Sequence, residues 1–174
     1  MLFYSSEDQG GADCASCHSG GFFSDEEFHN IATPQIGHGK GDGESGHEDF
    51  GRYRETQLDN DKFAFRTPTL LNVANTGPWM HSGAFTTLID TVEHSVNAKK
   101  SIESYHNIVM EQPGMQNMDM AADYATAAMN SSNFEGGDLE INGVEKMKSL
   151  VNFDIPDDSV ICDLFMDQVV RACV

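Results

Sequence analysis

The pentapeptide Cys14-Ala15-Ser16-Cys17-His18 constrains this chain more than any other feature of its sequence. Its spacing, C-x-x-C-H, is the pattern by which haem c is attached to a polypeptide. In such sites the two thiols add to the vinyl groups of the haem, and the histidine becomes the proximal iron ligand. We therefore predict one covalently bound haem c, held by Cys14 and Cys17 and ligated by His18.

Zinc sites and redox dithiols also use a C-x-x-C pair. A structural zinc site needs a second Cys or His pair at short spacing, but the other cysteines, Cys162 and Cys173, are distant and unpaired in this sense. On one unbroken helix these two would be roughly 16 Å apart, too far for a disulfide, whose Cα atoms lie within about 7 Å. The glycines around the motif do not fit a thioredoxin-like dithiol, and the adjacent His18 favours haem.

Composition limits the partners and the compartment. The 174 residues include 28 acidic and 10 basic side chains, and the net charge of -18 argues against nucleic acid and anionic membranes as partners. A basic electron-transfer partner or bound calcium agrees with this acidity, as does a simple solubility adaptation. No run approaches the roughly 20 apolar residues of a membrane span. No signal peptide is visible at the N-terminus, yet haem c is attached outside the cytoplasm, so we expect a periplasmic or extracellular mature product or fragment.

The pattern of apolar residues and breakers predicts a mainly α fold with long loops in a single domain, residues 1–174. Residues 19–65 are a glycine-rich and polar loop region, and no run shows sustained β alternation. Thr86 or Thr87 is expected to cap a helix that ends near Val96. A short helical piece is expected at 70–73, and further helices at 105–110, 118–129, 144–151 and from about 157 to 171.

Beyond the motif, residues 14–97 resemble the C-terminal haem domain of bacterial dihaem cytochrome c peroxidases and their MauG-like relatives. The segments that carry this resemblance are Cys14–His18, Phe28-His29-Asn30-Ile31, Gly51-Arg52, Phe65-Arg66-Thr67-Pro68-Thr69-Leu70-Leu71-Asn72-Val73-Ala74, Thr76 to Phe85, and Thr87-Leu88. On this basis residues 1–98 match the family, 99–139 form an unassigned insertion and 140–174 form C-terminal helices.

The resemblance implies a class I cytochrome c-like haem domain. In this family two haem domains face each other, the N-terminal haem carries the peroxide chemistry and the C-terminal haem relays electrons. The resemblance thus implies the electron-transfer half of a periplasmic peroxidase-type or MauG-like oxidoreductase. Its partners would be a second haem domain or chain and a small redox protein, either a cytochrome or a copper protein. The alternatives are a non-catalytic monohaem subunit of an extracellular assembly and a simple monohaem cytochrome c, which lacks the segment 65–85.

The resemblance also implies roles for individual residues. Arg66 would lie near the haem propionates, where a guanidinium pairs with a carboxylate. His81 would contact a haem propionate directly, or would contact another residue that does so. The backbone carbonyls of Thr76 and Pro78 correspond to calcium ligands, and other ligands of that ion come from the second haem domain.

The distal iron ligand departs from the family pattern, because Ser95 occupies its position. On a helix, position 95 is expected to face the apolar side together with Leu88 and Val92. Three alternatives remain for the distal position of the iron. In order of preference they are ligation by His94, an open site without a protein ligand, and ligation by a methionine. The methionines considered are Met80, Met110 and Met115, for each of which core packing is the ordinary explanation.

Three further histidines, His29, His38 and His47, are spread over the glycine-rich region. Their irregular spacing favours solvated loop histidines over a metal site. The acidic residues around them lack the regular spacing of a calcium-binding EF-hand loop.

Overall fold

The computed structural model describes residues 3–6, 9, 11–110, 119–137 and 139. The helices predicted at 144–151 and 157–171, together with Cys162, Cys173 and Met115, lie outside this part of the chain. Within it, no helix is long and apolar enough to cross a membrane.

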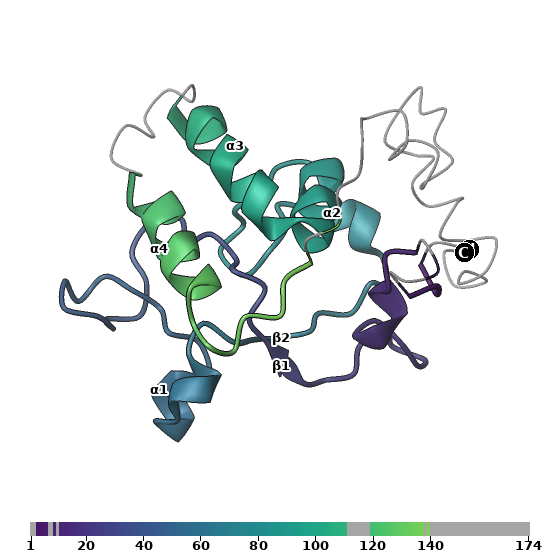
Figure 1. The fold of residues 1–174 in the computed structure, drawn as a ribbon, viewed down its shortest axis with the longest axis horizontal. Helices are drawn as coiled ribbons and strands as arrows, with labels where there is room; N and C mark the ends of the chain where they lie inside the picture. The colour runs from purple at the N-terminus through teal and green to yellow at the C-terminus, as the bar shows by residue number, and fades with distance from the viewer. Residues whose placement is uncertain (1–2, 7–8, 10, 111–118, 138, 140–174) are drawn as a thin grey trace.

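The described residues form a small mixed fold of four α-helices and one two-stranded sheet (Figure 1). The helices are α1 (Tyr53–Thr56), α2 (Leu88–Val96), α3 (Ala98–Met110) and α4 (Asp119–Met129). Short 3-10 turns occur at Cys14–Ser16, Asp59–Asp61 and Val73–Asn75. The strands β1 (Phe28–His29) and β2 (Phe65–Arg66) pair antiparallel, with Phe28 opposite Arg66. The mainly α expectation is therefore confirmed in its helices and loops, while the small sheet was not foreseen.

Helix α2 begins as its sequence predicts. The Thr87 hydroxyl accepts a hydrogen bond from the backbone N–H of Asp90 at 3.1 Å, which satisfies one of the donors left open at a helix start. Helix α4 also agrees with its predicted span. Helix α3 begins earlier than the predicted residue 105, because the Asn97 side chain accepts from the Lys100 N–H at 2.9 Å and caps it. The turn expected at 70–73 forms slightly later, at Val73–Asn75.

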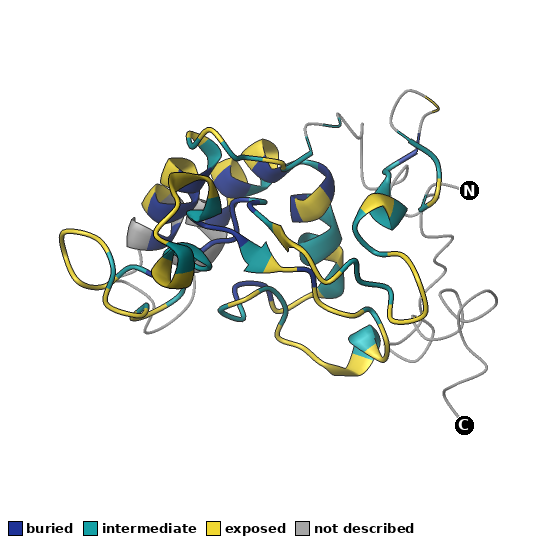
Figure 2. Ribbon diagram, turned by 90° about the horizontal axis from the view of Figure 1, so that it is seen from below, coloured by how far each residue is buried: buried dark blue, intermediate teal, exposed yellow. Residues whose placement is uncertain are grey.

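Helix α3 lies between α2 and α4 and contributes to both parts of the core. Ile102 of α3 packs in a cluster with Ala32, Phe63 and the α4 side chains Tyr124, Ala125 and Ala128. Tyr105, one turn further along α3, joins a second cluster made with Ala84, Phe85 and Ala121. The small alanine side chains of α4 allow the two helices to approach closely. Figure 2 shows the buried residues gathered where these helices meet.

A buried asparagine ties the segment after β1 to the end of α4. The Asn30 side chain is fully buried, and its amide donates to the Ala128 carbonyl at 2.9 Å and to the Ser131 hydroxyl at 2.8 Å. Its side-chain oxygen accepts from the backbone N–H of Ala32 at 3.0 Å. These bonds hold the segment that follows the Cys14–His18 turn against the helical core.

Candidate haem site

The motif Cys14–His18 folds as a single tight helical turn. The backbone N–H groups of Cys17 and His18 both donate to the carbonyl of Cys14, the second at 2.8 Å. Residues three and four positions apart on a helical turn share one side. The turn therefore brings Cys14, Cys17 and His18 close together along the chain, as a covalent haem with a proximal histidine requires. This segment lies at the opposite end of the molecule from α4 (Figure 1).

The His18 ring is oriented for metal ligation. Its Nδ1 lies 3.0 Å from the carbonyl oxygen of Phe23, which can only accept a hydrogen bond. The proton therefore belongs on Nδ1, and the lone pair is on Nε2. A backbone carbonyl that holds the outer nitrogen of a histidine is the usual support of a metal-ligating imidazole. The described residues thus fit a haem at this motif.

The two cysteines are both free thiols and partly buried. Burial is the main cause that raises the pKa of each thiol, and nearby carboxylates raise the pKa of Cys17 further. Both cysteines are therefore available in the reduced form that thioether formation needs.

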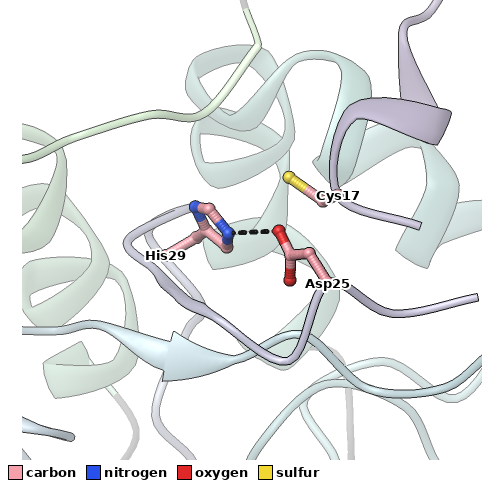
Figure 3. A group of neighbouring side chains, drawn as sticks. All are labelled: Cys17, Asp25 and His29. Carbon is pink, nitrogen blue, oxygen red and sulfur yellow. Dashed lines mark hydrogen bonds and ion pairs between the residues drawn. The ribbon is translucent and has the colours of Figure 1, made fainter. Parts of the chain in front are cut away.

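A cluster of polar side chains lies beside Cys17 (Figure 3). His29 contacts Asp25 through Nε2 at 2.9 Å and Glu135 through Nδ1 at 2.5 Å. Burial alone would lower the pKa of His29, but the hydrogen bonds and charges of Glu135 and Asp25 outweigh it and raise the pKa. The expectation that His29 is a solvated loop residue is wrong. Asp25 lies only four residues before His29, but Glu135 is 106 residues away in the sequence, so no local signal points to the complete cluster.

The structure places Arg66 beside the loop that follows the motif. Its guanidinium pairs with the exposed carboxylate of Glu26 at 3.2 Å, and its Nε donates to the Glu26 carbonyl at 3.3 Å. Two hydroxyl groups, those of Ser24 and Thr69, tie the same loop to the segment that follows Arg66.

Comparison with curated proteins identifies relatives of this chain. It is 37% identical over 103 residues to the cytochrome-c peroxidase IdrP1 of Denitromonas iodatirespirans. It is 32% identical over 89 residues to the methylamine utilization protein MauG of Methylophilus methylotrophus, and 30% identical over 118 residues to MauG of Methylorubrum extorquens. These matches cover 48%, 50% and 65% of this chain.

Over about half of its length, this chain is a relative of cytochrome-c peroxidases and MauG. The predicted resemblance is thereby confirmed. The matched regions make up 27%, 23% and 30% of those relatives, so the chain corresponds to about a quarter of their length. No family model matches the chain. No solved structure matches it either, so the class I cytochrome c-like fold stays a prediction.

His94, the first predicted candidate for a distal iron ligand, is fully buried in the structure. Its Nε2 lies 2.8 Å from the Ile31 carbonyl and its Nδ1 lies 3.2 Å from the Ser101 hydroxyl. Burial lowers the pKa of His94 to about 4. Both ring nitrogens are thus bound to protein groups, and ligation of iron by His94 requires one of these bonds to break. This geometry favours a structural role for His94.

The other distal candidates are placed as follows. Ser95 is exposed and donates its hydroxyl to the Thr91 carbonyl at 3.0 Å, so the expectation that it faces the apolar side of α2 is wrong. The buried residues of α2 are His94 and Val96. Met80 packs against the cluster around Phe85, which supports its ordinary role in the core. The side chain of Met110 lies outside the described part.

The remaining residues implied by the MauG relationship lie around β2 and the loop before α2. His81 stacks on Phe65, with ring centroids 4.0 Å apart, and its Nε2 lies 3.1 Å from the Asp49 carboxylate. Thr76 and Pro78 are exposed. A propionate contact for His81 and calcium binding by the carbonyls of Thr76 and Pro78 stay predictions.

Proposed function

We propose that this chain binds one covalent haem c and serves as the electron-transfer haem domain of a dihaem cytochrome c peroxidase or MauG-like oxidoreductase in the periplasm. The observation that carries the proposal is the helical turn at Cys14–His18 with the His18 Nδ1 proton bonded to Phe23. The chemistry that haem c supplies when bound is a one-electron couple between Fe(III) and Fe(II).

The chain's own residues have three tasks in this proposal. Cys14 and Cys17 anchor the group covalently, so that it stays bound in either oxidation state. The Phe23 carbonyl holds the His18 ring in one orientation and strengthens it as a ligand. Arg66 is available to a propionate, because its present partner Glu26 is exposed and surface ion pairs of this kind contribute little stability.

The proposal extends to the partners and the domain plan. Residues 1–174 would form a single class I cytochrome c-like domain that faces a second haem domain or chain, with calcium held partly by the Thr76 and Pro78 carbonyls. The net charge of -18 favours a redox partner with a basic docking surface, as a small cytochrome or copper protein can offer. The peroxide or substrate chemistry would take place at the second haem.

The test is to produce the full chain in a bacterial periplasm together with a haem c maturation system. Intact-mass spectrometry should show the mass of one haem per chain, and the Cys14→Ala/Cys17→Ala double variant should show none. His18→Ala should change the iron spectrum, while a matched exposed histidine variant, His38→Ala, should leave it unchanged. A chain that matures without a covalent haem would overturn the proposal.

The number of haems in the native assembly distinguishes an electron-transfer half of a dihaem enzyme from a non-catalytic monohaem subunit. An electron-transfer half predicts two haems per assembly unit and electron flow from a reduced small cytochrome or copper protein to peroxide. One haem per unit, with no such turnover, would instead support the non-catalytic monohaem subunit.

A further inference from the structure

We propose that, before haem is attached, Cys17, Asp25 and His29 form a binding site for a zinc-type divalent metal ion. Attachment of haem to Cys17 would remove this site, since the sulfur then becomes a thioether. The inference concerns the haem-free chain and does not rest on the proposed electron-transfer function.

The three side chains already point toward one another, as Figure 3 shows. The Cys17 sulfur, a carboxylate oxygen of Asp25 and a ring nitrogen of His29 all lie within 4.8 Å of one another. Their backbones are tied together, because the N–H of Asp25 donates to the Cys17 carbonyl at 2.8 Å. His29 stands in β1, which pairs with β2 and limits its movement.

One thiolate, one imidazole and one carboxylate are donors that Zn²⁺ accepts, and three protein ligands leave a fourth position for water. Tetrahedral ligands at the usual zinc distances lie about 3.5 Å from one another. The Asp25 oxygen and the His29 Nε2 are already 2.9 Å apart, so it is chiefly the Cys17 sulfur that has to move closer, which rotation of its partly exposed side chain can supply.

Glu135 supplies the feature that distinguishes this group from an accidental cluster. Its carboxylate lies 2.5 Å from Nδ1 of His29. A histidine that ligates a metal commonly donates its second ring N–H to such a carboxylate, which orients the ring and raises its basicity. The Nε2 atom then faces Asp25 at 2.9 Å, and a metal ion would take the place of the proton that these two atoms now share.

Charge around the cluster also favours a cation. The carboxylates of Asp25, Glu135 and Asp13 all act electrostatically on the Cys17 thiol. A bound divalent ion would offset their mutual repulsion and would stabilise the thiolate, releasing the thiol proton to solvent.

A zinc site at C-x-x-C normally needs a second Cys or His pair nearby, and Cys162 and Cys173 are too distant in the sequence to be predicted as that pair. In the structure, Asp25 and His29 lie beside Cys17 and supply the additional ligands instead. Cys14, the other thiol of the motif, is not part of the group, and this makes it a matched control.

The test uses the full chain in its haem-free, reduced form and Co²⁺ as a spectroscopic probe of the zinc site. We expect one Co²⁺ per chain, a sulfur-to-cobalt charge-transfer band in the near ultraviolet, and loss of that band when Zn²⁺ is added. Cys17→Ser should abolish the band, and Cys14→Ser should retain both the band and the affinity. Glu135→Gln should weaken binding roughly tenfold or more through the His29 ring.

Two results would overturn the inference. One is equal loss of binding in Cys14→Ser and Cys17→Ser, which would indicate an ordinary dithiol site. The other is the absence of a cobalt–thiolate band in the folded wild-type chain. His29→Gln is compared with wild type by circular dichroism, and loss of the band in a folded variant supports the site. The haem-loaded chain should show no cobalt–thiolate band, because its Cys17 sulfur is a thioether. If the chain binds haem covalently but its haem-free form binds no Co²⁺, the metal site is refuted while the proposed function is not.

Discussion

The buried His94 side chain should make the stability of this protein depend on pH between about 4 and 6.5. Burial lowers the pKa of His94 to about 4 in the folded protein, whereas the unfolded chain has the ordinary value of 6.5. Between these values the unfolded state binds more protons than the folded state, so the free energy of unfolding falls as the pH falls. Above pH 6.5 the group is neutral in both states and contributes no pH dependence.

The magnitude follows from the two pKa values. At pH 4 the preferential protonation of the unfolded chain costs about 3 kcal/mol, with a slope near 1.4 kcal/mol per pH unit. No discount for solvent screening applies, because His94 is fully buried. The raised pKa of His29 stabilises the folded state at low pH, and this stabilisation is lost only as the pH rises above 6.5. The lowered pKa of Asp25 stabilises the folded state at neutral pH, and this stabilisation is lost only as the pH falls below about 3.8. Neither group therefore produces the slope between pH 4 and 6.5.

The assay is urea unfolding followed by circular dichroism at several pH values for wild type and His94→Gln. The glutamine amide can still donate to the Ile31 carbonyl but does not titrate. Glu93, whose raised pKa gives a dependence of opposite sign, is present in both proteins and cancels in the difference. We expect wild type to lose about 3 kcal/mol more than the variant between pH 7 and pH 4. Parallel pH profiles would refute the assignment of a buried neutral histidine.

Three further substitutions test the fold by the same unfolding measurement. Asn30→Ala should cost about 3 kcal/mol, because it leaves the buried Ala32 N–H without its acceptor and removes the bonds that the buried Asn30 amide donates to Ala128 and Ser131, and exposed Asn130→Ala should cost under about 0.5 kcal/mol. Thr87→Ala should cost about 1 kcal/mol through loss of the α2 cap, and Thr86→Ala, which removes no cap, should cost less. Tyr105→Phe should cost about 1 kcal/mol, since its hydroxyl donates to the buried Ala84 carbonyl at 2.8 Å; a neutral result would contradict that bond.

Sequence reasoning succeeded where the controlling contacts are local. The start of α2 follows from Thr87 and the N–H of Asp90, three positions later, and the span of α4 follows from its own apolar pattern. The start of α3 was missed although its signal is equally local, since the Asn97 side chain accepts from the N–H of Lys100, three positions later.

Sequence reasoning failed where the outcome depends on contacts between distant segments. The side of α2 that is buried was predicted from Leu88 and Val92, but the carbonyl of Ile31, 63 residues before His94, holds the histidine inside. Likewise, spacing alone could not show that Glu135 is a partner of His29, since Glu135 reaches it only through the fold.

By itself, the sequence determined the chemistry of the Cys14–His18 turn and the relationship to cytochrome-c peroxidases and MauG. One helical turn is enough to bring those thiols and that imidazole together, so no distant contact is needed. Only the tertiary structure decided that His94 is enclosed and that Cys17 has Asp25 and His29 as neighbours. Burial and hydrogen-bond partners depend on segments that meet in space, and residue order along the chain does not encode those meetings locally.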